Sequence, residues 1–335
     1  MQDVQNFRFR RGLLAATLAV AVAAGAGGAP LAWAQGDHWP AKPIRLVVNF
    51  PPGSSPDVLA RAVSLPLQQA LGQPVVVDNR AGASGMIGAD MVAKAAPDGY
   101  TLLMTAGSTI TTNPFIYPKM PYDTDKDLVP VAAAARVALF LVVRPELPVN
   151  NLREFLAYMK ANPGKLSYGS AGNATGLHLA GEMLKGQAGV DAVHVPYKGA
   201  SPALQDLLAG QIDFYFDPGI ALGQVRAGKL KMLGVAVAHR SSAFPDVPTL
   251  AEAGLKGFDA GTTHGFYAPA GTPPEIVARL NREINKILAL PAVRTQIATI
   301  GAEPSPMSPA QFAALMADDS KRYGAVIRER GIRAD

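Results

Sequence analysis

The stretch Ile44-Arg-Leu-Val-Val-Asn-Phe-Pro-Pro-Gly-Ser-Ser-Pro-Asp57 joins an apolar strand, a loop of Gly and Ser, and the start of a helix. The second half of the chain repeats this order in Leu166-Ser-Tyr-Gly-Ser-Ala-Gly-Asn-Ala-Thr175, which precedes another helical segment. The first N–H groups of a helix have no partner inside it and the helix dipole is positive there, so each start suits an anion. Two such starts in one chain predict two lobes that close on a small anionic solute.

The N-terminus has the three parts of a secretory signal peptide. Three arginines between residues 8 and 11 form a basic segment, residues 13–26 are apolar, and Ala32-Trp-Ala34 matches a cleavage site. We therefore expect residues 1–34 to be removed, a mature chain that begins near Gln35, and a soluble periplasmic protein. A retained anchor is the alternative, although the apolar run is short for a membrane span.

Composition limits the kinds of protein that this chain can be. With 335 residues, 49% of them hydrophobic and 17% charged, it is long enough for two folded α/β domains. The net charge of +5 becomes +3 once the leader's three arginines and one aspartate are gone. Lys and Arg are scattered rather than clustered, so we expect no nucleic-acid partner. Because the chain has no Cys, disulfides and a lipid-anchored N-terminus are excluded.

Apolar strands alternate with amphipathic helices along the chain, which is typical of parallel sheets covered by helices. The pattern predicts strands at 44–49, 75–78, 101–105, near 137–143, and at 166–168, 192–195, 211–216, 230–238 and 261–269. It predicts helices at 56–71, from the glycine loop to about 95, from about 152, and at 175–185, 202–208, 220–227, 273–288, 292–300 and 309–330. Pro66 is expected to kink or shorten the first of these helices.

The order of these elements predicts a discontinuous first domain. After residue 269 the pattern contains only helices, and helices without strands must pack against a sheet made earlier in the chain. We therefore predict domain 1 from residues 35–138 plus 259–335, and domain 2 from 139–258. The chain would cross between them near residues 137 and 260, which would form the hinge, and we expect a monomer.

Small and polar residues follow several predicted strands, at the sheet edge where α/β proteins bind ligands. They supply free N–H groups and hydroxyls without a lysine or arginine. The predicted ligand-binding residues are Phe50, Gly53, Ser54, Ser55, Asp57, Gly107, Ser108, Thr109, Ser170, Ala171, Gly172, Asn173, Thr175 and Asp217.

Several of these residues also fit purely structural roles. Ser55 is placed as the N-cap of the first helix, where Asp57 would complement the dipole, and Asn173 or Thr175 would cap the helix after the second loop. Asp217 would equally cap the helix at 220–227. His178 fits a packed histidine. The loop from Gly82 to Gly88 resembles a dinucleotide fingerprint but lacks its tight opening, so we interpret it as a strand-to-helix turn.

The sequence argues against an enzyme. Its five histidines are far apart in the chain and there is no Cys, so we expect neither a metal site nor a cofactor. The run Gly169-Ser-Ala-Gly172 does not have the spacing of a nucleophile elbow. An exported serine hydrolase that uses a loop serine such as Ser170 stays as the alternative, because the members of a Ser–His–Asp triad can be distant in sequence.

Seven motifs, in order along the mature chain, resemble one family. They are Trp39-Pro-Ala-Lys-Pro-Ile-Arg-Leu-Val-Val, Ala70-Leu-Gly-Gln-Pro-Val-Val-Val-Asp-Asn-Arg, Ala96-Pro-Asp-Gly-Tyr-Thr-Leu-Leu, Tyr168-Gly-Ser-Ala-Gly-Asn, His194-Val-Pro-Tyr-Lys-Gly, Pro245-Asp-Val-Pro-Thr and Ala268-Pro-Ala-Gly-Thr-Pro. The chain resembles the Bug-type extracytoplasmic solute receptors of tripartite tricarboxylate transporters.

This resemblance implies a periplasmic-binding-protein fold of type II, with two doubly wound α/β domains and the ligand between them. It implies a small carboxylate ligand (a di- or tricarboxylate, an acidic amino acid or an aromatic acid), held by amides and hydroxyls and delivered to membrane transporter subunits. A receptor that presents its ligand to a sensor kinase is a further alternative. The first loop departs from the family pattern at Ser54-Ser55-Pro56. Pro56 stiffens this loop and removes a backbone N–H.

Overall fold

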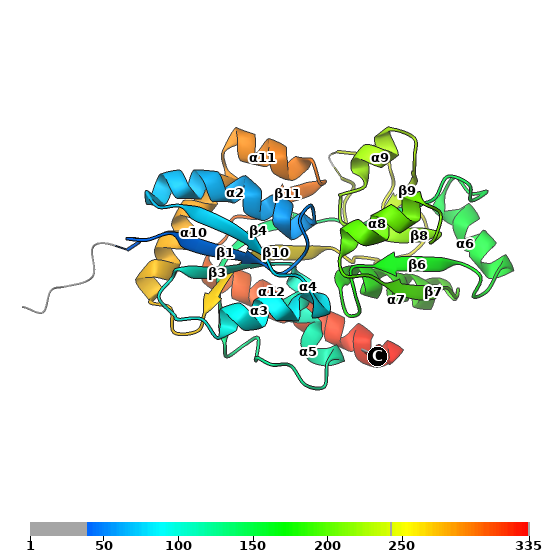
Figure 1. The fold of residues 1–335 in the computed structure, drawn as a ribbon. Coiled ribbons are helices and arrows are strands. Elements are labelled where there is room, and N and C mark those ends of the chain that lie inside the picture. The colour runs from blue at the N-terminus through cyan, green and yellow to red at the C-terminus, as the bar shows by residue number, and fades with distance from the viewer. Residues whose placement is uncertain (1–38, 242, 334–335) are drawn as a thin grey trace, which may run out of the picture. The chain divides into compact units, whose positions relative to one another are not determined.

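The computed structural model describes residues 39–241 and 243–333. The predicted leader, residues 1–34, and its cleavage site lie outside this range. From Pro40 onward the chain forms one compact unit that contains two β-sheets, each covered by helices (Figure 1). The predicted mixed α/β class is confirmed.

The first sheet has six strands in the order β11-β4-β10-β3-β1-β2. Its parallel part consists of β1 (Ile44–Val48), β2 (Val75–Asn79) and β3 (Thr101–Thr105). The antiparallel strand β10 (Thr262–Pro269) pairs with both β3 and β4 (Leu128–Val137), and β11 (Ala302–Pro304) pairs with β4. A late segment of the chain thus completes a sheet that the first third begins.

Helices cover both faces of this sheet (Figure 1). On one face lie α2 (Ser55–Leu71), α10 (Pro274–Leu288) and α11 (Pro291–Ala298). On the other lie α3 (Met86–Ala93) and α12 (Pro309–Arg330), whose Phe312 packs on Tyr267 of β10. A 3-10 turn, η1 (Ala83–Gly85), precedes α3, and two short helices, α4 (Gly107–Thr111) and α5 (Asn113–Ile116), follow β3.

The second sheet has five strands in the order β7-β6-β8-β5-β9. They are β5 (Phe140–Val143), β6 (Ser167–Ser170), β7 (Val193–Pro196), β8 (Phe214–Asp217) and β9 (Lys231–Val235). Strand β6 is parallel to both neighbours, whereas β5 is antiparallel to β8 and β9. The associated helices are α6 (Leu152–Ala161), α7 (Gly176–Ala188), α8 (Ala200–Leu208) and α9 (Leu222–Arg226). We call the two sheets with their helices the first and second lobes.

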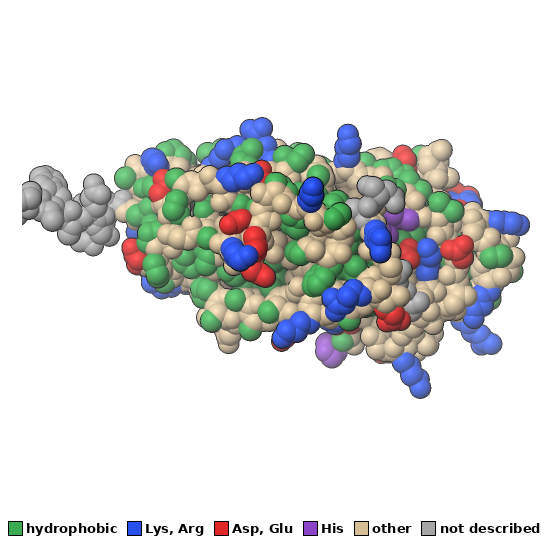
Figure 2. All heavy atoms as spheres, turned by 90° about the horizontal axis from the view of Figure 1, so that it is seen from below, with side chains coloured by type: hydrophobic (Ala, Val, Ile, Leu, Met, Phe, Trp, Pro, Cys, Tyr) green, Lys and Arg blue, Asp and Glu red, His purple; other side chains and the backbone are tan. Residues whose placement is uncertain are grey.

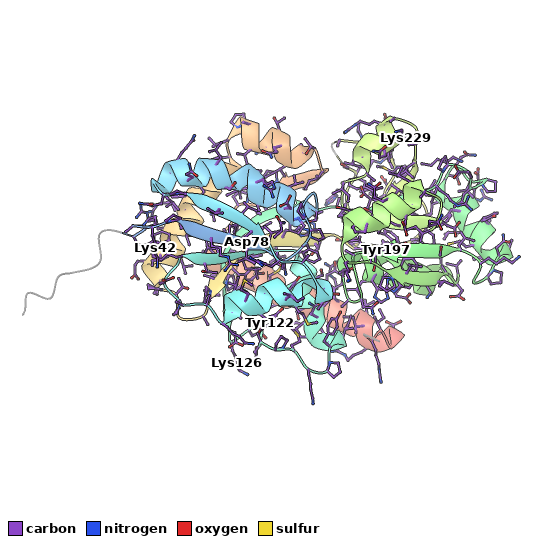
Figure 3. All side chains as sticks on the ribbon, viewed as in Figure 1. Lys42, Asp78, Tyr122, Lys126, Tyr197 and Lys229 are labelled. Carbon is purple, nitrogen blue, oxygen red and sulfur yellow. The ribbon has the colours of Figure 1, made fainter. Side chains whose placement is uncertain are left out.

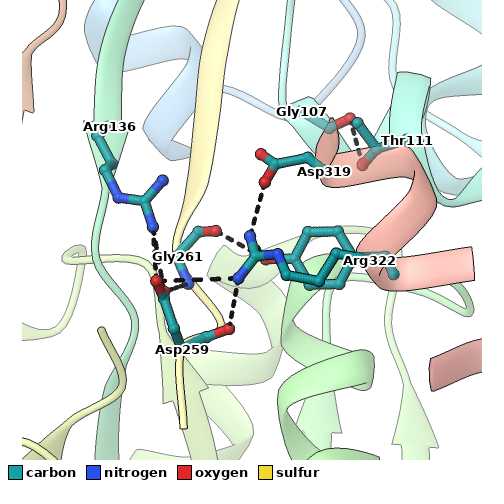
Figure 4. Close-up of polar contacts among 8 residues, drawn as sticks. Gly107, Thr111, Arg136, Asp259, Gly261, Asp319 and Arg322 are labelled. Carbon is teal, nitrogen blue, oxygen red and sulfur yellow. Dashed lines mark hydrogen bonds and ion pairs between the residues drawn. The ribbon is translucent and has the colours of Figure 1, made fainter. Parts of the chain in front are cut away.

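A network of ion pairs lies where the chain passes between the lobes (Figure 4). Asp259 lies just before β10 and accepts from Arg136 at the end of β4, with 3.0 Å between Nη2 and Oδ2. Arg322 of α12 donates to the Asp259 carbonyl at 3.0 Å and to Asp319 Oδ1 at 2.7 Å. The neighbouring Tyr323 hydroxyl donates to the Gly261 carbonyl at 2.7 Å. These hydrogen bonds hold α12 against residues 259–261, which lead into β10.

The structure corrects several predictions about the elements. Strand β4 was not predicted, and the apolar run at 137–143 is broken between β4 and β5. The expectation of helices only after residue 269 is wrong, because β11 adds an edge strand. Pro66 neither ends nor shortens α2, which continues for 17 residues because Leu59, Val63 and Leu67 stay buried along one face.

Candidate functional site

The first loop, residues 50–57, is held by one carboxylate. Asp57 is 3% exposed and accepts from the backbone N–H of Gly53 at 2.9 Å, from Asn79 Nδ2 at 2.9 Å and from Arg61 Nε at 3.0 Å. Burial raises the pKa of Asp57, but the hydrogen bonds from Arg61, Gly53 and Asn79 outweigh it, so the net shift is downward. Asp57 therefore shapes the loop as an ionised group.

The helix start in this loop differs from the prediction by one residue. Ser54, not Ser55, is the N-cap, and its hydroxyl donates to the Pro51 carbonyl at 2.7 Å instead of accepting from the helix. Ser55 is thus the first helical residue, and its Oγ lies 3.0 Å from His264 Nε2.

His264 on β10 is a site residue that sequence reasoning missed. It is 2% exposed, and burial lowers its pKa to about 3, so the imidazole is neutral near pH 7. Its contact with Ser55 spans 209 residues of sequence, and the only local signal was a polar residue in an otherwise strand-like run.

The segment after β3 is the short helix α4 rather than an open loop. Its Ser108 is 5% exposed and no hydrogen bond from its hydroxyl is found within the described part of the chain. Thr109 accepts from Asn49 Nδ2 at 3.3 Å, and a Cβ on Gly107 would lie 2.4 Å from Thr262 Oγ1. Ser108 is therefore the residue of this segment whose polar group is available to a solute.

The second loop, residues 170–175, is held by two histidines. Ser170 Oγ lies 2.7 Å from His194 Nε2, and the backbone N–H of Ala174 donates to His178 Nδ1 at 3.2 Å. The two imidazoles stack with ring centroids 3.8 Å apart and an interplanar angle of 1°. Burial, together with the charges of His178 and Lys185, lowers the pKa of His194 to about 3. Histidines that are apart in the sequence are therefore adjacent here, and they position a loop.

The two loops meet around an inner cavity between the lobes. Its lining comprises Phe50, Ser54, Ser55, Pro56, Ala106, Ser108, Leu139, Ala171, Thr175, Gly176, Leu177, Ala200, Pro218, Thr262 and His264. Its free volume of about 30 Å³ has room for water only.

An outer cavity of about 220 Å³ adjoins the inner one and shares Phe50 and Ala171 with it. Gly172 and Asn173 also line it. Its other lining residues are Pro51, Gly82, Ala83, Ser84, Gly85, Tyr117, Pro196, Tyr197 and Lys198, of which Tyr197 is labelled in Figure 3.

The structure brings some of the predicted residues to these cavities and leaves others away from them. Phe50, Ser54, Ser55, Ser108, Ala171 and Thr175 line the inner cavity, and Gly172 and Asn173 the outer one. Gly53, Asp57, Gly107, Thr109, Ser170 and Asp217 line neither.

Asp217 holds the turn that leads into α9. It is fully buried and accepts from the N–H of Gly219 at 2.9 Å, from that of Ala221 at 3.0 Å and from the Tyr215 hydroxyl at 2.5 Å. Burial raises its pKa to about 6. The capping interpretation of this residue therefore accounts for its hydrogen bonds.

Hydrogen bonds also join the lobes directly. Ser84 Oγ donates to the Asn173 carbonyl at 2.5 Å, and Thr112 Oγ1 donates to the Ala174 carbonyl at 2.5 Å. Within the described residues, the non-glycine positions with positive φ are Ala83 and Ser84, in the loop at 82–88, and Ala174, in the second loop. The loop at 82–88 is thus a strand-to-helix turn that also contacts the second lobe.

Residues 39–241 and 243–333 lack two features of other classes of protein. No helix in that range is long and apolar enough to span a membrane. The same range contains no group of three or more His, Cys, Asp or Glu side chains arranged to hold a metal. On the face drawn in Figure 2, Lys and Arg side chains lie among hydrophobic and other residue types, several of them beside Asp or Glu.

Solved structures place this architecture in a class. The structure of R. palustris Rpa4515 with adipate is 35% identical, covers 89% of this chain and 100% of that chain, and has a TM-score of 0.86. MatC from Rhodopseudomonas palustris with bound malate is 35% identical, with 86% and 100% coverage and a TM-score of 0.82. The structure of the periplasmic binding protein BugD is 33% identical, covers 89% of this chain and 100% of that chain, and has a TM-score of 0.84, so the fold is that of the periplasmic solute-binding proteins.

The particular family follows from the sequence comparisons. The family model described as "Tripartite tricarboxylate transporter family receptor" matches residues 59–332. Protein BugT of Bordetella pertussis is 40% identical over 323 residues, which are 96% of this chain and 98% of BugT. The chain belongs to the tripartite tricarboxylate transporter receptor family. Members are solute-binding receptors, so the prediction of a binding protein rather than an enzyme is confirmed.

Proposed function

We propose that this chain is an exported receptor that binds a small carboxylate between its lobes and delivers it to a membrane transporter of the tripartite tricarboxylate type. The observation that carries the proposal is the inner cavity, where the first turns of α2 and α7 meet hydroxyl side chains. Helix starts and hydroxyls bind a carboxylate without a paired cation. The adipate and malate in the structures of the relatives support this ligand class.

The domain boundaries, the leader and the monomeric state belong to the same proposal. The strands of the second sheet come from residues 140–235, and those of the first come from both sides of that range. This supports domain 1 from residues 35–138 plus 259–335 and domain 2 from 139–258, with a hinge at the Asp259 ion pairs. Residues 1–34 would direct export and then be removed.

The predicted site residues are proposed as two groups. Those that line the cavities would touch the solute or face it. Those that line neither cavity would fix the loops, as the carboxylates of Asp57 and Asp217 do through backbone N–H groups.

Titration calorimetry with a panel of carboxylates tests the proposal. A carboxylate should bind the folded protein, and Ser108→Ala should weaken it about fivefold, because one hydrogen bond contributes about 1 kcal/mol. Thr175→Ala should weaken binding less, since that hydroxyl already donates to the Gly172 carbonyl. Ser64→Ala is the matched control, because the only partner of Ser64 Oγ in the described part of the chain is the Arg61 carbonyl on α2. Folded protein that binds no carboxylate would overturn the proposal.

The partner needs a separate test, because a sensor-kinase receptor would bind its ligand equally well. Co-purification with transporter membrane subunits in the presence of ligand is the expected result. Capture of a sensor kinase in their place would replace the transport role while leaving the binding role intact.

A further inference from the structure

A further cavity lies within the first lobe. It has a free volume of about 340 Å³ and shares no lining residue with the inner or the outer cavity. Its walls come from α4, from the segment 124–130 that includes the start of β4, from β10 and from α12. Small-molecule sites usually have volumes of about 300–1,000 Å³, so this cavity is large enough for a ligand of its own.

The buried part of its lining is apolar and includes one hydroxyl without a partner. Ile110, Leu128 and Met316 line the cavity and are each at most 8% exposed. Tyr267 also lines it, is 2% exposed, and its hydroxyl has no hydrogen-bond partner within the described residues. Burial and the nearby charge of Asp319 raise the pKa of Tyr267, so the hydroxyl stays protonated. Because buried polar groups usually have a partner, this hydroxyl is suited to donate to a bound molecule.

Two carboxylates give the cavity a negative character. Asp125 lines it at an exposed position, and its carboxylate has no hydrogen bond or ion pair within the described residues. Asp319 directly precedes the lining residue Ser320 and is 5% exposed. Its Oδ1 accepts from Arg322, whereas its Oδ2 has no hydrogen-bond partner in the described part of the chain. Since the described lining contains no Lys or Arg, the cavity favours a cation.

Small side chains of α12 leave the cavity open to solvent. Ala313 and Ala317 line it, are exposed and lie four residues apart on the helix, and Ser320 continues the same face. A larger side chain at one of these exposed positions would fill the cavity from outside, without a change in the core of the lobe.

We propose that this cavity binds a small organic amine that has an apolar body and, at the end opposite the amine, a hydroxyl or carbonyl group. The ammonium group lies beside Asp125 at the exposed side, and the apolar body lies among Ile110, Leu128 and Met316. The hydroxyl or carbonyl oxygen accepts a hydrogen bond from Tyr267. This site is separate from the carboxylate site between the lobes and does not depend on it.

Titration calorimetry with tyramine tests the proposal, because tyramine has an ammonium group and a hydroxyl at opposite ends of an aromatic body. Ala317→Leu should weaken tyramine binding at least tenfold, since the larger side chain fills the cavity. The matched control is Ala314→Leu, at an exposed position of α12 outside the cavity lining, which should bind tyramine as the wild type does. Equal affinities of the two variants would overturn the proposal.

A second substitution tests the hydrogen bond inside the cavity. Tyr267→Phe keeps the ring that packs on Phe312, and it should weaken tyramine about fivefold, as expected for the loss of one hydrogen bond. Phenethylamine lacks the hydroxyl of tyramine, so its affinity should be the same for this variant and for the wild type. If both amines lose the same factor, or neither loses any, the contact with Tyr267 is wrong.

A third substitution tests the charge at the exposed side. Asp125→Asn should weaken tyramine about threefold, because an ion pair at an exposed site contributes little. The control is Asp318→Asn, whose carboxylate is 77% exposed on α12, and it should leave the affinity unchanged. Equal losses would mean that tyramine responds to net charge and not to Asp125, which would contradict the proposal.

The outcomes are independent of the proposed function. Binding of a carboxylate such as 3-(4-hydroxyphenyl)propionate should be the same in Ala317→Leu and in the wild type, because a carboxylate is expected only at the inner cavity. If tyramine does not bind the folded wild-type protein, this cavity holds only water and the inference is wrong, while the carboxylate site between the lobes is unaffected.

Discussion

The first loop (residues 50–57) and the second loop (residues 170–175) share a sequence pattern but are held by different chemistry. In the first, a backbone N–H donates to the ionised carboxylate of Asp57. In the second, a backbone N–H donates to the imidazole of His178, which stacks on His194. Both arrangements leave a strand, a loop and a helix start facing the inner cavity. One carboxylate and one stacked pair of imidazoles therefore produce the same local geometry.

The difference has a consequence for the response to acid. The pKa of Asp57 is lowered, so its contribution to stability is complete above the pKa of the unfolded carboxyl, near 4, and is lost only below it. The pKa of His194 falls from 6.5 to about 3, so the unfolded chain takes up a proton in that window while the folded chain does not. Stability from His194 is complete above pH 6.5 and declines as the pH falls toward 3.

The largest expected effect is that of removing Asp57. Asp57→Ala leaves the Gly53 N–H and the Asn79 amide without their acceptor, and it should lower the free energy of unfolding by about 3 kcal/mol. Urea denaturation measures this. The control is Asp318→Ala, whose carboxylate is 77% exposed and pairs among the described residues only with Lys321, so its effect should stay within about 0.5 kcal/mol. Equal effects of the two variants would mean that Asp57 does not hold the loop.

His194 should make the second loop sensitive to mild acid. Between pH 7.5 and pH 5, His194 should cost the folded state about 1–2 kcal/mol, because its unfolded form is protonated there and its folded form is not. His194→Gln should flatten the pH dependence of unfolding by that amount. The matched control is His239→Gln, which replaces an exposed histidine outside both loops. If His194→Gln keeps the full slope, the imidazole of the second loop is not the acid-sensitive group.

The two loops were predictable from the sequence because their determinants are local. Apolar alternation, glycines and helix-start residues act over a few positions, which is also why the start of α12 at residue 309 was predicted. The N-cap of this helix, Ser308, has a full capping box. The exact cap of α2 was wrong by one residue, since Ser54 and Ser55 are chemically equivalent in a local pattern.

Other features depend on distant parts of the chain. Strand β4 contains Ala132-Ala-Ala-Ala135, which has little strand propensity, and it is a strand because β10 and β11 pair with its two edges. Strand β11 has three residues, too few for a periodic pattern. His264 and His194 contact serines 209 and 24 residues away, so no spacing rule could identify them.

The smallest expected effect concerns a feature that the two loops share, the hydroxyl of the N-cap residue of the helix that follows each loop. The N-cap hydroxyls of Ser54 and Thr175 make no cap hydrogen bond, and each donates to the carbonyl three residues before it, at 2.7 and 2.8 Å. Ser54→Ala and Thr175→Ala should therefore each cost about 0.5–1 kcal/mol of stability, less than the loss of a strong cap. Because the two residues belong to different lobes, the double variant should be additive within about 0.5 kcal/mol in urea denaturation. A larger coupling free energy between the two substitutions would show that the two loops stabilise each other.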